Sequence, residues 1–257
     1  MNSLIFDFIT DVLFFYMPGL VNTIRKMYMI YTGMPENWRR FLKHKVAFYQ
    51  NLSPDEQIYF EKRIIEFLFD YRIKGIDYKP TDEDKLLVAA GAVIPVFRFN
   101  DWYYPNLKTV YLFADQFSIN HPLIKKGTQL NGLVGAGKMK GKMYLSVKAL
   151  HNSFDNERDK KNTAVHEFLH LIDMEDGRGD GVPETLLQRP YVIPWQNLIK
   201  TEIERICAGK SALNDYACTN ATEFFAEAGV HFFENPVELK QHHPELYAML
   251  QKIFKYK

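Results

Sequence analysis

The chain has 257 residues, of which 47% are hydrophobic and 15% aromatic, so it is long enough to bury a sizeable core. Its formal net charge of +1, without a long block of one sign, excludes the basic footprint of a nucleic-acid-binding protein. The two cysteines, Cys207 and Cys218, show no disulfide framework and are typical of a reducing compartment. We therefore expect a globular cytoplasmic protein with no nucleic-acid partner.

The N-terminal segment of residues 4–24 is rich in Leu, Ile, Phe and Val. Asp7 and Asp11 interrupt it and Pro18 breaks it, so it lacks the roughly 20 consecutive apolar residues that a membrane-spanning helix needs. We expect a packed or partner-binding helix, and the alternative is a weak peripheral membrane contact through these residues.

The rest of the chain predicts a helix-rich α+β protein. We divide it into an apolar N-terminal appendage, residues 1–33, and one main domain, residues 34–257. Ser53 and Glu56 form a capping box that begins a helix, and a second helix begins at Thr81 and ends before Pro95. Strands are predicted at 108–114 and 142–147, and further helices near 160–175, 184–207 and 220–234 and after Pro244.

The chemistry is concentrated in the sequence His-Glu-x-x-His at residues 166–170. On a helix, His166 and His170 lie one turn apart on the same face and can bind one Zn²⁺ ion. Glu167 lies beside them and is the candidate general base for a water molecule that zinc activates. Asp173 shares their face, and we expect it to accept a hydrogen bond from a ligand imidazole. The competing interpretation is a chance coincidence, which the apolar neighbours disfavour because buried polar groups cost free energy unless satisfied.

A catalytic zinc site normally has three protein ligands, so a third must come from downstream. Residues 220–234 predict a helix with Glu223 in its first turn and small side chains behind it, which would let two helices approach closely. Glu223 is therefore the candidate third ligand, although Asn220 followed by Glu223 is also an ordinary capping pattern. Glu227, one turn further on, is the competing ligand.

The remaining histidines predict structural roles. His231 lies two turns beyond Glu223, which favours a structural role over a catalytic one. His242 and His243 are adjacent, so they cannot both face one metal, and we expect them at the surface or at a helix cap.

Several blocks together resemble the Mlc titration factor A family of zinc metallopeptidases, which are also described as anti-repressors. They are Met34-Pro-Glu-Asn-Trp-Arg-Arg, Gly141-Lys-Met-Tyr-Leu-Ser-Val, residues 166–173, residues 216–226 and His243-Pro-Glu-Leu-Tyr.

The resemblance implies a zincin-like, gluzincin-type core whose active site lies between the His-Glu-x-x-His helix and the downstream glutamate helix. It further implies one zinc ion held by His166, His170 and Glu223, with Glu167 as base and Tyr216 as a stabiliser of the transition state. The activity implied is hydrolysis of short peptides of the aminopeptidase type. We also expect the strand at residues 142–146 to form the edge of the cleft, where an extended peptide can pair with its backbone. The alternative is a regulatory protein that sequesters a transcriptional repressor and has weak or latent peptidase activity.

Overall fold

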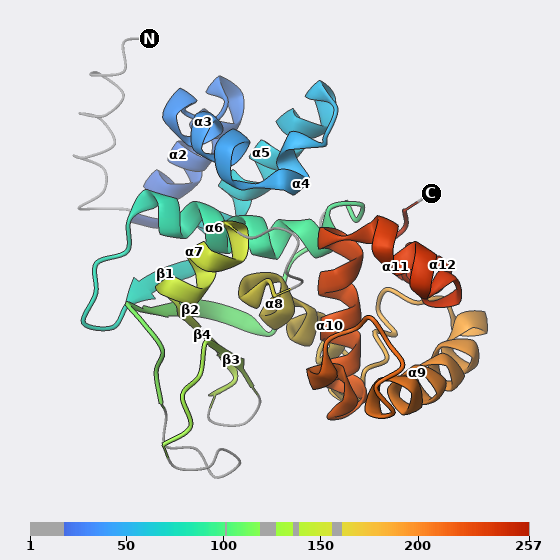
Figure 1. Cartoon of the computed structure of the whole chain (residues 1–257). Coiled ribbons are helices and arrows are strands. Elements are labelled where there is room, and N and C mark those ends of the chain that lie inside the picture. Colours follow the sequence, from blue (N-terminus) through green and yellow to red (C-terminus); the bar gives the residue numbers. More distant parts are fainter. Residues whose placement is uncertain (1–17, 101, 119–126, 136–138, 156–160, 257) are drawn as a thin grey trace.

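A small sheet lies beside a central helix, and further helices lie on both sides of that helix (Figure 1). The computed structural model describes residues 18–100, 102–118, 127–135, 139–155 and 161–256. Its first half contains α2 (Pro18–Thr32), α3 (Glu36–Lys45), α4 (Ala47–Gln50), α5 (Pro54–Asp70), β1 (Arg72–Gly75), α6 (Asp82–Val93), η1 (Ile94–Val96) and β2 (Leu107–Phe113). Its second half contains β3 (Gly132–Val134), β4 (Gly141–Ser146), α7 (Val147–Asp155), α8 (Thr163–Asp173), η3 (Arg189–Tyr191), α9 (Val192–Cys207), η4 (Asp215–Cys218), α10 (Ala221–Glu234), α11 (Pro236–His242) and α12 (Pro244–Ile253).

The sheet has the strand order β1-β2-β4-β3. β1, β2 and β4 are parallel, whereas β3 pairs antiparallel with β4, so that Gly132 lies opposite Leu145 and Val134 opposite Met143. These strands and the many helices confirm the predicted helix-rich α+β class with a small sheet. The prediction that the strand at residues 142–146 forms an edge is wrong, because β4 lies between β2 and β3 and the edge strand is β3.

The central helix α8 is held between α6 and α10 at two close approaches. A Cβ atom added to Gly91 of α6 would lie 2.5 Å from the Cβ of Ala164, and one added to Gly229 of α10 would lie 2.6 Å from Leu169 Cδ1. At Gly91 the Cβ and backbone of the neighbouring helix leave room for glycine alone, and at Gly229 the side chain of Leu169 fills the space that a Cβ atom would need. The small residues of α10 therefore bring it against α8, as the sequence predicted.

The helix starts that were predicted from capping patterns are confirmed. Ser53 and Glu56 form the reciprocal capping box of α5, and Thr81 and Asp84 form that of α6. α9 begins at Val192 and not near residue 184 as predicted, because residues 184–187 form turns and a bend and η3 follows them.

The apolar N-terminal segment is described only from residue 18. Within α2, Val21 is buried and the helix packs against α5, whereas Leu20, Met27 and Tyr31 are exposed. Residues 4–17 lie outside the described residues, so the membrane contact and the domain boundary at residue 33 stay predictions. None of the helices described in the structure has the length and apolarity that crossing a bilayer requires.

The two cysteines form a disulfide, Cys207–Cys218, which joins the end of α9 to the end of η4. The cysteines were expected to be typical of a reducing compartment because no disulfide framework was visible, and they pair because the turn after α9 brings their Cα atoms to 5.4 Å. The cytoplasmic location stays a prediction that the cysteines no longer support.

Candidate metal centre

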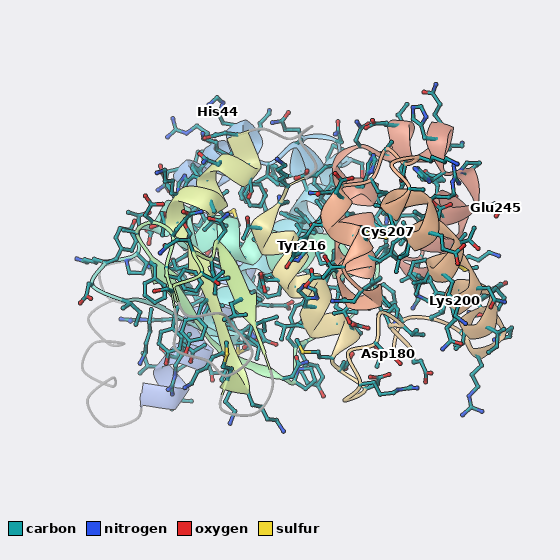
Figure 2. All side chains as sticks on the ribbon, turned by 60° about the horizontal axis from the view of Figure 1, so that its bottom comes forward. His44, Asp180, Lys200, Cys207, Tyr216 and Glu245 are labelled. Carbon is teal, nitrogen blue, oxygen red and sulfur yellow. A yellow bond between two sulfur atoms is a disulfide. The ribbon has the colours of Figure 1, made fainter. Side chains whose placement is uncertain are left out.

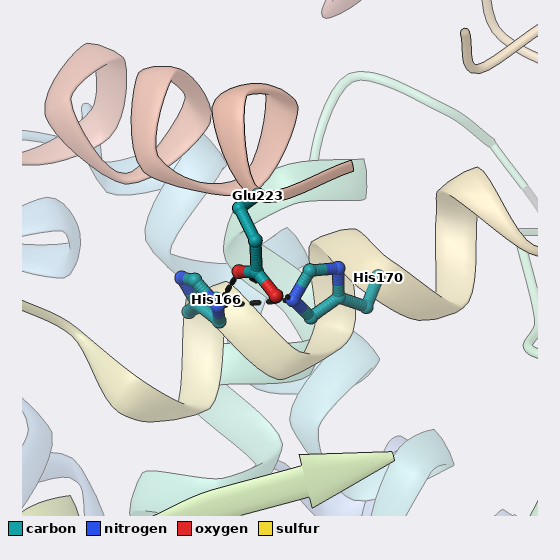
Figure 3. A group of neighbouring side chains, drawn as sticks. All are labelled: His166, His170 and Glu223. Carbon is teal, nitrogen blue, oxygen red and sulfur yellow. Dashed lines mark hydrogen bonds and ion pairs between the residues drawn. The ribbon is translucent and has the colours of Figure 1, made fainter. Parts of the chain in front are cut away.

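Three side chains from two helices converge at one point (Figure 3). α8 begins at the cap Asn162, whose side chain accepts a hydrogen bond from the backbone of Val165, and this places His166 and His170 on one face. α10 begins at the cap Asn220, and Glu223 stands in its first turn, directed at the two imidazoles. The structure thus brings together the two predicted histidines and the predicted glutamate.

The distances within this group fit a tetrahedral metal ion. The Nε2 atoms of His166 and His170 are 3.0 Å apart, and Glu223 Oε2 lies 3.2 Å and 3.3 Å from them. Three ligands about 2.0 to 2.1 Å from a tetrahedral zinc ion would be separated by about 3.3 Å. Glu223 Oε2 is buried and has no hydrogen-bond partner among the described residues. Two imidazoles and one carboxylate are also a donor set that zinc accepts, so the residues present fit a zinc ion.

The charges around this group favour a cation. Burial lowers the pKa of His166, but Glu223 and Glu227 outweigh it and raise that pKa to about 10. Burial raises the pKa of Glu223, but the two imidazoles outweigh it and lower that pKa to about 2. The surrounding carboxylates therefore stabilise positive charge at the point where the donor atoms meet.

Glu167 lies beside the group and is covered by the edge strand. Its side chain is 6% exposed, and burial raises its pKa, while the imidazoles of His170 and His166 oppose the effect. A Cβ atom added to Gly132 of β3 would lie 2.5 Å from Glu167 Oε1. The absence of a side chain at position 132 therefore makes room for this carboxylate.

Glu227 does not face the convergence point. Its Oε1 atom lies 3.2 Å from His166 Nδ1, the ring nitrogen that points away from Glu223. A carboxylate at this nitrogen orients the imidazole and strengthens it as a ligand. Glu227 therefore supports His166, and the alternative that it binds the metal is not favoured by its position.

The hydrogen bond that the sequence predicted between Asp173 and an imidazole is not formed. Asp173 is fully buried, and its Oδ2 atom accepts a hydrogen bond of 3.0 Å from the backbone of Gly181. Asp173 Oδ1 and His170 Nδ1 have no hydrogen-bond partner among the described residues. Burial raises the pKa of Asp173 to about 6. The carboxylate is directed to the loop after α8, which the spacing on the helix could not reveal.

Tyr216 lies near the group, on η4. Its ring centroid is 6.4 Å from that of His166, and its side chain is 53% exposed (Figure 2). Burial of its hydroxyl and the carboxylates of Glu223, Glu167 and Glu227 raise its pKa. The hydroxyl therefore keeps its proton and remains a hydrogen-bond donor.

His231 and His243 were expected to have structural roles, and both are buried beside a glutamate. His231 is buried and lies 3.3 Å from Glu238, in agreement with its predicted structural role. His243 precedes α12 at its cap position, but it is 2% exposed and its Nδ1 atom lies 2.7 Å from Glu202. Of the two predicted positions, surface or cap, His243 therefore takes the cap, and its ring is buried against a partner that is 41 residues away in the sequence.

The chain matches known proteins over most of its length. The family model described as glucose-regulated metallo-peptidase M90 matches residues 21–255. An uncharacterized protein of Synechocystis sp. is 28% identical over 241 residues, which cover 90% of this chain and 87% of that protein. Mlc titration factor A of Klebsiella pneumoniae is 25% identical over 212 residues, 77% of this chain and 78% of that protein. Mlc titration factor A of Pectobacterium atrosepticum is 27% identical over 140 residues, 48% of this chain and 51% of that protein.

Proposed function

Since the chain belongs to the glucose-regulated metallo-peptidase M90 family, we propose that it is a zinc-dependent peptidase that hydrolyses short peptides. The relatives also confirm the resemblance to Mlc titration factor A. The observation that carries the proposal is the convergence of His166, His170 and Glu223 with the buried carboxylate of Glu167 beside them.

In this proposal His166, His170 and Glu223 hold one zinc ion, and Glu227 orients the imidazole of His166. When bound, zinc supplies Lewis-acid chemistry that polarises the scissile carbonyl and makes a water molecule more acidic. Glu167 accepts a proton from that water and later donates it to the leaving amine. Burial beneath β3 suits Glu167 to this exchange because it raises the pKa of the carboxyl toward neutrality.

Tyr216 donates a hydrogen bond to the oxyanion that develops on the scissile carbonyl. Its proximity to His166 and its raised pKa support this role. Its half-exposed side chain leaves the hydroxyl able to reach a substrate.

The substrate lies along β3, the edge strand next to Glu167. An extended peptide can pair its backbone with a sheet edge, which gives affinity with little sequence selectivity. This suits short peptides, and the preference for aminopeptidase-type substrates follows from the family resemblance.

Removal of the metal tests the function. We expect hydrolysis of short chromogenic peptides and aminoacyl anilides to disappear with a chelator and to return when one equivalent of zinc is added. Turnover that survives complete removal of the metal would contradict the proposal. Zinc content is measured in parallel, so that loss of metal and loss of activity can be compared directly.

Gly132→Ala tests the contact between β3 and Glu167. We expect kcat to fall about tenfold or more, because the added methyl group displaces the general base, and general base catalysis contributes about 10²- to 10⁴-fold. Zinc content should not change. The matched control is Gly135→Ala, whose Cβ atom would meet Met139 at an ordinary 3.5 Å. Equal activity of the two variants would show that Gly132 does not set the position of Glu167.

A second candidate function is the sequestration of a transcriptional repressor, which the name of the Mlc titration factor A relatives favours. In that case one zinc ion would be bound without turnover of any peptide, and the peptide-binding edge would serve a protein partner. The two functions can coexist on one chain.

A further inference from the structure

Tyr216 belongs to a loop that needs its own support. The loop joins α9 to α10, and Tyr216 stands on the short turn η4, where half of its side chain is exposed. Figure 2 shows Tyr216 beside α8, whose His166 ring lies 6.4 Å from the tyrosine ring. A half-exposed side chain on a short turn has few packing contacts of its own, so its position depends on what holds the backbone.

A chain of polar side chains, buried at Glu202 and His243 and partly buried at Ser211, holds the first part of this loop. His243 Nδ1 lies 2.7 Å from Glu202 Oε2 of α9, and His243 Nε2 lies 3.2 Å from Ser211 Oγ. Glu202 and His243 are 3% and 2% exposed, and Arg205 donates to the other oxygen of Glu202. Such a pair is costly to bury unless its hydrogen bonds are satisfied, and here they are.

The order Ser211, His243, Glu202 is that of a serine hydrolase triad, but its surroundings differ. The backbone N–H of Ala212 donates to His243 Nε2, and that of Leu213 donates to Ser211 Oγ. A backbone N–H can only donate, so Nε2 accepts, and the proton of the ring stays on Nδ1 toward Glu202. Both the base and the hydroxyl are therefore engaged by the loop, and the chain binds the loop rather than a substrate.

The loop is fixed at its other end as well. Asn214 caps η4 by accepting a hydrogen bond of 3.0 Å from the backbone of Tyr216, and Ala217 is fully buried. The disulfide ties Cys218, two residues after Tyr216, back to Cys207 of α9. The segment from α9 to Tyr216 is thus held by a covalent link and by the chain of polar side chains from Glu202 through His243 to Ser211.

We propose that Glu202, His243 and Ser211 are positioning residues that hold the loop so that Tyr216 reaches the metal centre, and that the Cys207–Cys218 disulfide fixes the same loop from its far end. The proposal rests on the proposed function, because it gives Tyr216 its task. It assigns a role to His243, which is not one of the three residues that converge at the metal centre.

The test uses Ser211→Ala, since His243→Ala would leave Glu202 buried without its partner and endanger folding. We expect Ser211→Ala to lower kcat about fivefold, the effect of one typical hydrogen bond, with KM and zinc content unchanged. In a Tyr216→Phe background, the same substitution should have no further effect, because the two act on one group. The control Thr201→Ala removes an exposed hydroxyl of α9 that bonds only to its own helix, and it should change nothing.

A spectroscopic readout separates this proposal from the function itself. With fluorotyrosine placed at position 216, we expect the ¹⁹F resonance to shift or broaden in Ser211→Ala and in the double variant Cys207→Ser, Cys218→Ser, but not in Thr201→Ala. An unchanged resonance in both variants, or kinetic losses that add in the Tyr216→Phe background, would overturn the proposal. If the wild-type protein hydrolyses no peptide, the proposed function fails, and the fluorine signal alone decides whether the loop is held in this way.

Discussion

Glu167→Gln should retain one zinc ion and lose at least about 100-fold in kcat, because general base catalysis contributes about 10²- to 10⁴-fold. The substitution keeps the size of the side chain beneath β3 and replaces an oxygen that accepts protons with an amide that cannot. None of the three candidate ligand atoms is altered. The measurement is kcat and KM with a short chromogenic peptide, together with zinc content by atomic absorption.

The matched control is Glu175→Gln, just beyond the end of α8. Its side chain lines a different cavity, beside Tyr103 and Lys255, and should leave turnover unchanged. Loss of zinc from Glu167→Gln would mean that this carboxylate is part of the metal site, and full activity would mean that another group acts as base.

The residues on α8 and α10 could be predicted from the sequence because their arrangement is local. The four-residue spacing of His166 and His170 is imposed by the helix itself. The approach of α10 was also predictable, since small residues such as Gly229 leave room on one face of a helix for a neighbouring helix to pack closely. The spacing alone left open the choice between Glu223 and Glu227, because both lie on one face of α10, and the family resemblance favoured Glu223.

The features that the sequence did not predict depend on contacts between distant segments. β3 has only three residues, starts with a glycine and is formed by pairing with β4, so no alternation of apolar residues marks it. The support of His166 by Glu227, and of His243 by Glu202, joins residues that are 61 and 41 positions apart. The disulfide likewise requires the turn after α9, and a pair of cysteines alone does not reveal whether such a turn exists.

Glu223→Ala and Glu227→Ala should both weaken zinc binding, but to different degrees. Glu227 contacts the far nitrogen of His166, and loss of such an outer contact typically costs about 10- to 100-fold in metal affinity. Glu223 directs Oε2 at the point where the two imidazoles converge, so Glu223→Ala removes a ligand. The loss of metal affinity should therefore be larger than the roughly 100-fold that is the upper end for an outer contact. Competition with a chromophoric chelator measures both dissociation constants, with Glu175→Ala as the control. A larger loss of zinc affinity in Glu227→Ala than in Glu223→Ala would make Glu227 the third ligand. Glu223 would then be only an acidic residue in the first turn of α10. Equal losses of zinc affinity in the two variants would show that neither Glu223 nor Glu227 is by itself the third ligand.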